Sequence, residues 1–415
     1  MDCYPEIFHD DHLIVYRNIL AHLPIFYLLK YRQNRNYSFL QGIHIITNCM
    51  IIGACGFGAT GSSVVTDYLK EFDNVQVKDN FEFTYVSGIN GLVYLERALM
   101  NPINRTGDSI YAIEQFKKRV SKYNFKYEKY GLSAEKFQQS ADEFIDAVTM
   151  TKWYWHNRYL GSSKISPLRI VAKIIEHKYV PNWERKHGKR YTKWPLSEVC
   201  LSVCPDNFYD AARKHVNDIL SGMGLNTNGV IALDQPFPGN NPQACFPYFD
   251  EPYAVVVDRD PRDLYVFGKT KLMGKMHFFP IDRVEDFITY YKCIRKDQPY
   301  LKDDPRILRL RFEDMVYEYD KTTAILREFL HLPENPHPKS VFDPSLSIAN
   351  TQVFKRYPQF SEDVKKIEEA LSEYLFDFSK YPTPDFSKKM FFGKSPKHEG
   401  FKKSYVQDGY VPQSK

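Results

Sequence analysis

The segment GFGATGSS, residues 56–63, has the composition of an anion-binding loop. It follows the apolar run IIGAC and precedes VVTDYLKEF, whose apolar residues have helical spacing. Glycines let a backbone wrap closely around an anion, and the unpaired N–H groups at the start of a helix favour negative charge. The residues expected to bind the anion are three glycines and three hydroxyl residues: Gly56, Gly58, Gly61, Thr60, Ser62 and Ser63. The alternative is a glycine-rich turn in which a serine only caps the helix.

The spacing of this loop matches the phosphate-binding pattern G-x-x-x-x-G-K-[ST], except that Ser62 stands where the pattern has lysine. Enzymes that hydrolyse ATP or GTP use that lysine to neutralise the β- and γ-phosphates. The sequence also shows no evident aspartate of the kind that holds magnesium in such enzymes. Both features count against a small-molecule kinase, which remains an alternative.

A second candidate for anion binding is the turn DRDPRD, residues 258–263, which follows the strand-like run AVVV. The planar guanidinium of Arg259 can make paired, charge-assisted hydrogen bonds to a phosphate. Arg262 could assist it, but we favour the interpretation that Arg262 pairs with Asp260 or Asp263.

Together these segments resemble the PAPS-dependent sulfotransferases, with the closest likeness to bacterial carbohydrate-type members; PAPS is 3′-phosphoadenosine 5′-phosphosulfate. Residues 56–63 resemble the family's 5′-phosphosulfate loop, and residues 258–263 resemble its 3′-phosphate turn. Residues 310–332, LRFEDMVYEYDKTTAILREFLHL, look like its Glu-Asp loop and the helix that follows. The resemblance covers about residues 50–380. It implies transfer of a sulfuryl group from PAPS, the co-substrate, to a hydroxyl of a carbohydrate or similar acceptor, without a metal.

The resemblance also implies a general base. Glu82, in VKDNFEF, matches the glutamate that does this work in Golgi-type carbohydrate sulfotransferases. We expect Phe81 and Phe83 to desolvate Glu82 and raise its pKa; the alternative is a surface glutamate on an alternating strand. His277 is the rival base.

Two positions depart from the family pattern. Ala59 stands where the loop often carries Lys or Arg, and Lys78 is the candidate to supply that cation, the alternative being a solvated charge at a strand end. Phe267 stands where a serine usually contacts the 3′-phosphate, and Lys269 or Thr270 would substitute for it. These departures leave open a nucleotide- or glycan-binding protein that has lost turnover.

The elements around these residues read as strands alternating with helices. Strand patterns are found at 50–55, 75–79, 230–238, 252–257 and 306–311, and helical patterns at 64–72, 321–332 and 361–375. This order predicts an α/β domain with a P-loop-like parallel β-sheet flanked by helices. We expect an N-terminal extension at 1–49, native or not, a sulfotransferase domain at 50–380 and a basic flexible tail at 381–415.

Residues 91–230 are interpreted as a long, mostly helical insertion on the acceptor side. It contains all four tryptophans, which are Trp153, Trp155, Trp183 and Trp194. Aromatic rings beside lysines and arginines would suit a sugar chain with acidic groups, although large aromatic residues also form the cores of helical domains.

The composition of the chain indicates which ligands and which compartment to expect. A net charge of +5 over 415 residues suits an anionic ligand, and no arginine-rich tract or aromatic RNA-binding pattern points to nucleic acid. Seven scattered cysteines favour a reducing, cytoplasmic location over a disulfide framework, and no metal site is expected. The most apolar segment, residues 13–29, is interrupted by Arg17, His22 and Pro24, so no confident membrane span is predicted.

Overall fold

The computed structural model describes residues 49–128, 131–155, 167–188, 197–270, 279–296, 304–388 and 390. The chain divides into two units, Met1–Ile45 and Ile46–Lys415, and every described residue belongs to the second. The expected N-terminal extension therefore lies outside the described residues except for Cys49, and the expected tail is described only at 381–388 and 390. His277 also lies outside the described residues.

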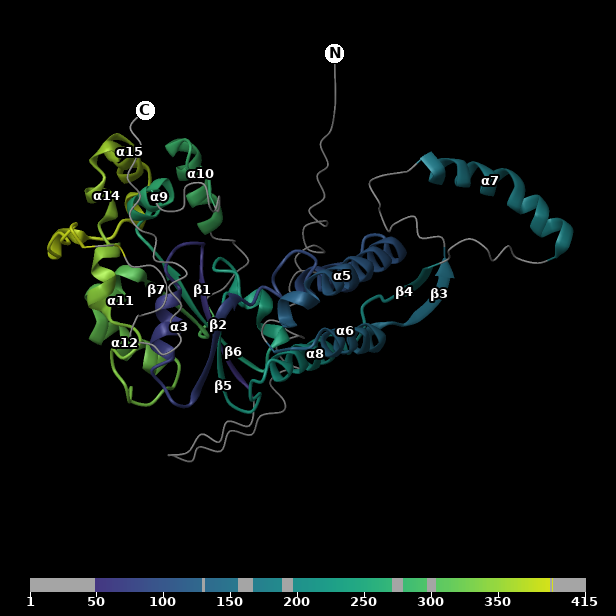
Figure 1. Cartoon of the computed structure of the whole chain (residues 1–415), viewed down its shortest axis with the longest axis horizontal. Helices are drawn as coiled ribbons and strands as arrows, with labels where there is room; N and C mark the ends of the chain where they lie inside the picture. Colours follow the sequence, from purple (N-terminus) through teal and green to yellow (C-terminus); the bar gives the residue numbers. More distant parts are fainter. Residues whose placement is uncertain are drawn as a thin grey trace, which may run out of the picture. The chain divides into compact units, whose positions relative to one another are not determined.

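A parallel sheet of five strands forms the centre of the second unit, in the order β2-β5-β1-β6-β7 (Figure 1). The strands are β1 (Met50–Gly56), β2 (Val75–Glu82), β5 (Val230–Asp234), β6 (Glu251–Asp258) and β7 (Ile307–Arg311). The middle strand, β1, is almost wholly buried because helices cover both faces of the sheet, as its continuous apolar run predicts. The predicted fold class is confirmed.

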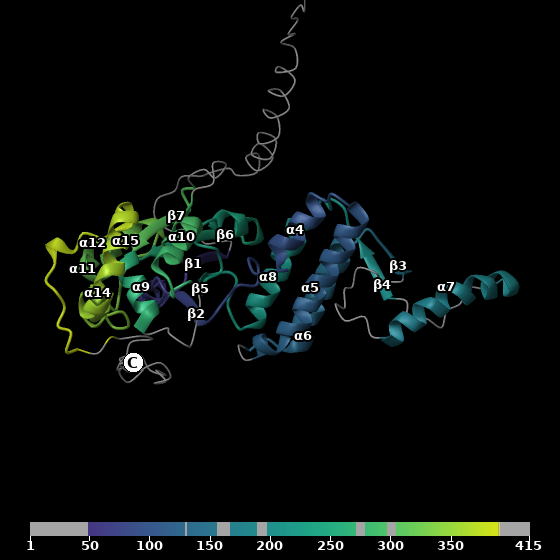
Figure 2. The ribbon, with the colours of Figure 1, turned by 90° about the horizontal axis from the view of Figure 1, so that it is seen from above.

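Helices cover the two faces with separate cores, because successive residues of a strand point to opposite sides. Ile52 and Ala54 pack with α3 (Ser63–Leu69), α11 (Phe312–Tyr317) and α12 (Tyr319–Phe329). Ile51 and Cys55 pack on the other face, in a cluster that includes four longer helices. These are α4 (Leu92–Met100), α5 (Arg105–Glu128), α6 (Ala134–Val148) and α8 (Phe208–Gly222), in which α5, α6 and α8 lie side by side (Figure 2).

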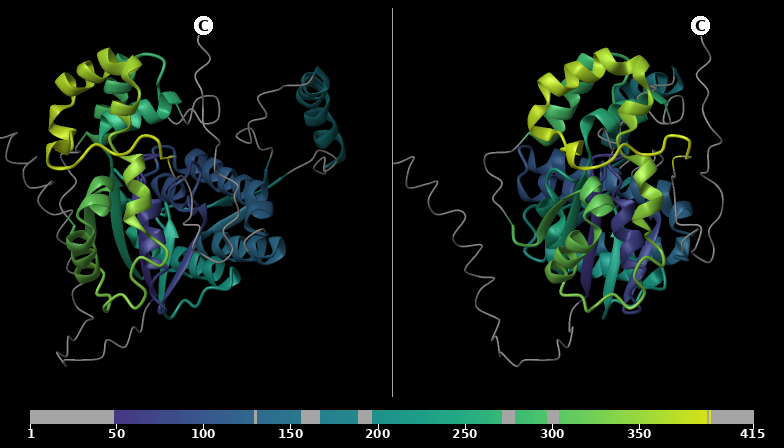
Figure 3. Two further views of the ribbon diagram at one scale, coloured as in Figure 1. Left: turned by 60° about the vertical axis from the view of Figure 1, so that its left-hand side comes forward. Right: turned by 90° about the vertical axis from the view of Figure 1, so that its left-hand side faces the viewer.

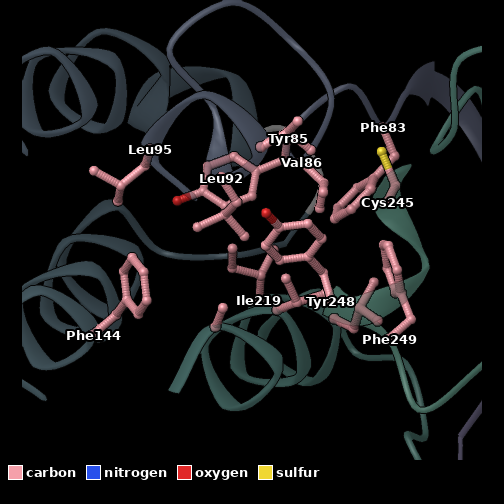
Figure 4. Close-up of a cluster of buried hydrophobic side chains, with 14 of the residues drawn as sticks. Phe83, Tyr85, Val86, Leu92, Leu95, Phe144, Ile219, Cys245, Tyr248 and Phe249 are labelled. Carbon is pink, nitrogen blue, oxygen red and sulfur yellow. The ribbon is translucent and has the colours of Figure 1, made fainter. Parts of the chain in front are cut away.

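The second of these cores is rich in aromatic rings. Tyr85, Tyr248 and Phe249 gather in it together with Leu92 (Figure 4). The buried hydroxyl of Tyr248 donates a hydrogen bond of 2.7 Å to Glu96, so the polar end of this ring is satisfied within the core.

A third apolar cluster joins segments that follow β6 and β7 in the chain. It consists mainly of α9 (Pro261–Thr270), α10 (Val284–Arg295) and α15 (Ser361–Ala370), with Val353 of α14 (Val353–Arg356). The C-terminal helices, drawn in yellow-green, lie beside α9 and α10 (Figure 3). This cluster supports the turn that carries Arg259.

The region 91–230 is mostly helical in its described part, but it also contains an antiparallel pair that the sequence did not predict. The pair consists of β3 (Thr151–Trp155) and β4 (Ser197–Leu201), between which the chain forms α7 (Pro167–His187). Trp153 is half-buried, whereas Trp183 is exposed and stacks on His187 at 4.6 Å between ring centroids.

Two further expectations about the helices need correction. Residues 312–317, expected as a loop, form α11, and the helix expected at 361–375 ends at Ala370. All six described cysteines are free thiols, and Cys204 is among the exposed ones. Within the described ranges no helix is long and apolar enough to cross a membrane.

Candidate active site

A cavity of about 540 Å³ opens at the carboxyl ends of β1, β2, β5 and β6. Ligands of open parallel sheets bind at this edge, and the volume is within the range of small-molecule sites. Its walls come from four places: the glycine loop, the ends of β2 and β5, the residues around Arg259, and the segment 341–350.

The glycine loop contributes a wall of main chain. Gly58, Ala59, Gly61, Ser62 and Ser63 all line the cavity. Gly61 has φ of +90°, and a Cβ on it would lie 2.6 Å from the ring of Phe312, so no other residue fits there without strain. The backbone of Gly61 has a positive φ, and that of Ser62 has the right-handed helical conformation. This alternation turns successive N–H groups toward one anion.

The N–H groups of this loop are available to a ligand. Within the described part of the chain, the main-chain N–H groups of residues 58–62 donate no hydrogen bond. Ser62 makes no side-chain cap on α3. The alternative in which a serine only caps the helix is therefore wrong.

Gln235, at the end of β5, braces the loop from outside. Its amide group accepts a hydrogen bond from the N–H of Gly56 at 3.2 Å and donates one to Ser62 Oγ at 2.7 Å. Thr60 is buried and accepts a hydrogen bond from the N–H of Phe57 at 3.2 Å. Gly56 and Thr60 thus shape the loop from within, whereas the other four predicted loop residues face the cavity.

Arg259 reaches the same cavity from the turn after β6. Its side chain is only 3% exposed, and its guanidinium lies 5.3 Å from the centroid of the Phe267 ring and 4.9 Å from that of Phe312. One terminal nitrogen donates a hydrogen bond to the carbonyl oxygen of Asn350, but the buried Nε has no partner among the described residues. A buried donor without a partner is costly, so this guanidinium is suited to an anionic ligand.

Arg262 is engaged elsewhere. It pairs with Asp260 at 2.8 Å and with Glu368 at 2.9 Å, which confirms the predicted pairing with Asp260. Two further acids, Asp263 and Glu313, are fully buried beside this turn. Burial raises the pKa of each carboxyl, that of Asp263 to about 7 and that of Glu313 to about 8, while the charge of Arg259 acts to lower the pKa of Asp263.

Carboxylates gather at the opposite side of the cavity. Glu82 and Asp234 lie directly across from one another on β2 and β5, after an irregularity in the register of β2, and both line the cavity. Glu82 is exposed, while the rings of Phe81 and Phe83 are buried in the core; these rings therefore do not shield Glu82 as expected.

Asp234 is a site residue that the sequence analysis missed. It is half-buried, and burial together with the nearby charges of Glu82 and Asp79 raises its pKa to about 7. The signal was present in VIALD, an apolar strand that ends in an aspartate. Asp234 ends β5, the strand next to β1.

The structure does not bring the two predicted lysines to the cavity. Lys78 lies within β2 opposite Leu233, and Lys269 lies in the last turn of α9, where it donates a hydrogen bond to the carbonyl of Asp282 at 3.1 Å. Among the described lining residues, Arg259 is the one cation, and the four carboxylates are Asp67, Glu82, Asp234 and Asp343. The described residues contain no group of three or more His, Cys, Asp or Glu side chains arranged to hold a metal ion.

The segment 341–350 closes the remaining side and was not predicted from the sequence. Val341, Phe342 and Asn350 are among its lining residues. Glu71, which is buried after α3, accepts hydrogen bonds from the N–H groups of Val341 at 3.0 Å and Phe342 at 2.9 Å. One buried carboxylate therefore fixes this wall to the helix that follows the loop.

Comparisons with known proteins give weak likenesses. No protein-family model and no curated protein sequence matches the chain. In structure the chain is similar to a sulfotransferase domain from the curacin biosynthetic pathway, with a TM-score of 0.33 and 12% identity over 80% of this chain and 99% of that one. It is also similar to sulfotransferase STF9 from Mycobacterium avium, with a TM-score of 0.31 and 11% identity over 89% of this chain and 82% of that one. A structure of retinol dehydratase in complex with androsterone and inactive cofactor PAP has a TM-score of 0.20 and 12% identity, covering 80% and 68% of the two chains. All these TM-scores are below 0.5, so the likenesses do not decide what the chain does.

Proposed function

We propose that this protein is a PAPS-dependent sulfotransferase that moves a sulfuryl group to a hydroxyl of a carbohydrate or similar acceptor. The observation that carries the proposal is that Gly61 and Arg259, from segments far apart in the sequence, line one cavity. The cavity thus offers two anion-binding groups, main-chain N–H donors and a guanidinium, to the two anionic ends of one nucleotide.

The residues present fit such a nucleotide. The loop N–H groups would hold the 5′-phosphosulfate, and Arg259, with its unpartnered Nε, would hold the 3′-phosphate. PAPS, when bound, supplies a sulfuryl group that is already activated for transfer. Donors that face the charge developing on the leaving oxygen are worth on the order of 10²–10³ in rate each, by analogy with oxyanion holes. Glu82, which lines the cavity, stays the first candidate for the base that takes the acceptor's proton, and Lys78 and Lys269, which do not line it, have no proposed role.

The acceptor class and the location are further parts of the proposal. Exposed Trp183 and the basic residues Arg185 and Lys186 at the end of α7 suit a sugar chain, because a flat ring offers it a stacking surface. The six free thiols suit a reducing compartment, which supports a cytoplasmic enzyme.

A small-molecule kinase is the second candidate, and Asp234 is the observation that favours it. ATP-binding enzymes hold magnesium with a hydroxyl residue of the loop and an aspartate, and Ser63 and Asp234 both line the cavity. The absence of a lysine at Ser62 still opposes it, because nothing else in the described lining replaces that charge near the loop.

Thermal unfolding with nucleotides tests the two candidates. We expect 3′-phosphoadenosine 5′-phosphate (PAP) to raise the Tm without magnesium, and ATP with magnesium to raise it less. The variant Gly61→Ala, in which the new Cβ meets Phe312, should lose the PAP effect. A larger effect of ATP that requires magnesium would favour the kinase and contradict the sulfotransferase.

Transfer of labelled sulfate from PAPS to neutral, acidic and amino-bearing polysaccharides then tests turnover. Labelled product supports the enzyme. PAP binding with no labelled product from any acceptor, including water, supports a binding protein without turnover.

A further inference from the structure

Two carboxyl groups, those of Glu82 and Asp234, face the same end of the cavity from adjacent strands. Their Cα atoms are direct partners in the β2–β5 pairing, so they are separated by about one strand spacing, ~4.8 Å. Phe83, which follows Glu82, donates a hydrogen bond of 2.7 Å from its N–H to the carbonyl of Asp234, which fixes the two backbones together.

We propose that Asp234, rather than Glu82, takes the proton of the acceptor hydroxyl, because Asp234 lies one strand closer to β1 and its loop. The inference rests on the proposed sulfotransferase function and changes the assignment of its base.

The position of Asp234 is the first support. Asp234 pairs with Ala54 of β1 on one side and Glu82 of β2 on the other, so it lies between the loop strand and the exposed glutamate. The next residue, Gln235, donates its hydrogen bond to Ser62 Oγ. Asp234 is therefore one residue away from a direct contact with the loop that would hold the transferred group.

The charges around Asp234 are the second support. Glu82 and Asp79 of β2 and Asp67 of α3 are negative, and Lys70 opposes them; burial and this excess of acids raise the pKa of Asp234 to about 7. Lys70 is itself held by Asp67 and Asp79, so its charge is largely engaged. A base works best when its pKa is near the working pH, and Asp234 meets this condition.

The transfer step balances as follows. The acceptor oxygen forms a bond to sulfur while its proton moves to a carboxylate oxygen of Asp234. The bond between sulfur and the bridging oxygen of PAPS breaks, and its electron pair leaves with PAP. Asp234 then releases the proton to water, so no oxidant, reductant or metal is needed.

Reciprocal variants separate Asp234 from Glu82. Asp234→Asn should lower kcat for sulfate transfer by on the order of 10²–10⁴, with PAP affinity changed less than threefold. Glu82→Gln should retain turnover at high pH, and the acid limb of its pH–rate profile should move to lower pH, because loss of a neighbouring negative charge lowers the pKa of Asp234. Asp142→Asn, which changes a carboxylate on α6 that does not line the cavity, is the matched control.

A readout without turnover uses ¹³C NMR of protein labelled at the aspartate carboxyl carbon. Of the aspartate signals that titrate near neutral pH, the one from Asp234 should vanish in Asp234→Asn and titrate at lower pH in Glu82→Gln. The carboxyl of Asp263, whose pKa is also raised, should not respond to either change.

The outcomes distinguish the inference from the function on which it rests. An active Asp234→Asn enzyme together with an inactive Glu82→Gln enzyme overturns the inference and returns the base to Glu82. A spectrum in which Asp234→Asn removes no aspartate signal that titrates near neutral pH also overturns it. Wild-type protein that does not bind PAP, or transfers sulfate to nothing, overturns the proposed function and the inference together.

Discussion

Arg259 and Arg262 leave the same turn after β6 but make different contacts. Arg262 lies between two acids, whereas Arg259 lies between two aromatic rings and contacts a single carbonyl oxygen. Phe267, which replaces an expected phosphate-binding serine, therefore still belongs to the site. Its ring packs against the guanidinium and lines the cavity.

We expect Arg259→Ala to weaken PAP binding about ten- to a hundredfold, the loss of one charge-assisted contact of roughly 1.5–3 kcal/mol. Arg259→Lys should recover only part of this, because lysine keeps the charge but not the planar fork. Arg262→Ala is the matched comparison, and it should lower the Tm while leaving PAP affinity nearly unchanged. Isothermal titration calorimetry measures all three, and equal Kd values in Arg259→Ala and the wild type would remove Arg259 from the site.

At the scale of elements, the wall 341–350 depends on an anchor outside it. Glu71 accepts hydrogen bonds from four donors in the preceding loop and the wall: Asn335 Nδ2 and the N–H groups of Lys339, Val341 and Phe342. Its loss would leave several buried N–H groups unpaired and would free one side of the cavity.

We predict that Glu71→Ala lowers the free energy of unfolding by roughly 2–4 kcal/mol and weakens PAP binding, because buried donors lose a charged acceptor. Glu71→Gln is the control, since it keeps an acceptor oxygen and should lose much less. Urea unfolding and calorimetry measure the two effects. Tight PAP binding in a destabilised Glu71→Ala protein would show that the wall does not contribute to the site.

The elements also show what the sequence could and could not predict. The apolar run before residue 56 and the glycines of GFGATGSS were enough to predict β1, the loop and α3, because these signals are local in the sequence. Asp234 was missed because its importance comes from pairing between β5 and two distant strands, β1 and β2. Lys78 was misplaced for the same reason, since a charge near the loop in sequence lies within a strand and outside the cavity lining. The pair β3–β4 has only short strand patterns in a region of helical composition.

At the scale of the whole molecule, stability depends on a buried histidine. His215 of α8 bonds to Tyr85 Oη and to Ser140 Oγ, each at 2.7 Å, and stacks on Phe144 at 5.5 Å between ring centroids. Burial, and secondly the charge of Lys214, lower the pKa of His215 to about 3. The folded protein therefore holds this ring neutral through the whole range in which an unfolded chain protonates it.

Below pH 6.5 His215 is protonated in the unfolded chain, whereas in the folded chain it stays neutral down to about pH 3. The free energy of unfolding therefore falls as the pH falls. The expected contribution is about 1.4 kcal/mol per pH unit, or roughly 3 kcal/mol between pH 6.5 and 4.5. The carboxyls of Asp234 and Glu313, whose pKa values are raised by folding, instead stabilise the folded protein as the pH falls. The contribution of His215 must therefore be isolated with a variant that lacks this histidine. Urea unfolding of the wild type and His215→Asn at both pH values measures the difference, and identical slopes would contradict the prediction.

The order of the strands also has a consequence for synthesis. Met50 of β1 pairs with Val230 on one side and Glu251 on the other, so neither neighbour exists when β1 leaves the ribosome. At ~5–20 residues per second the wait is on the order of ten seconds or longer. During that interval the nascent chain carries an apolar strand without a partner, and this strand can be buried in the sheet only after translation has passed β5 and β6.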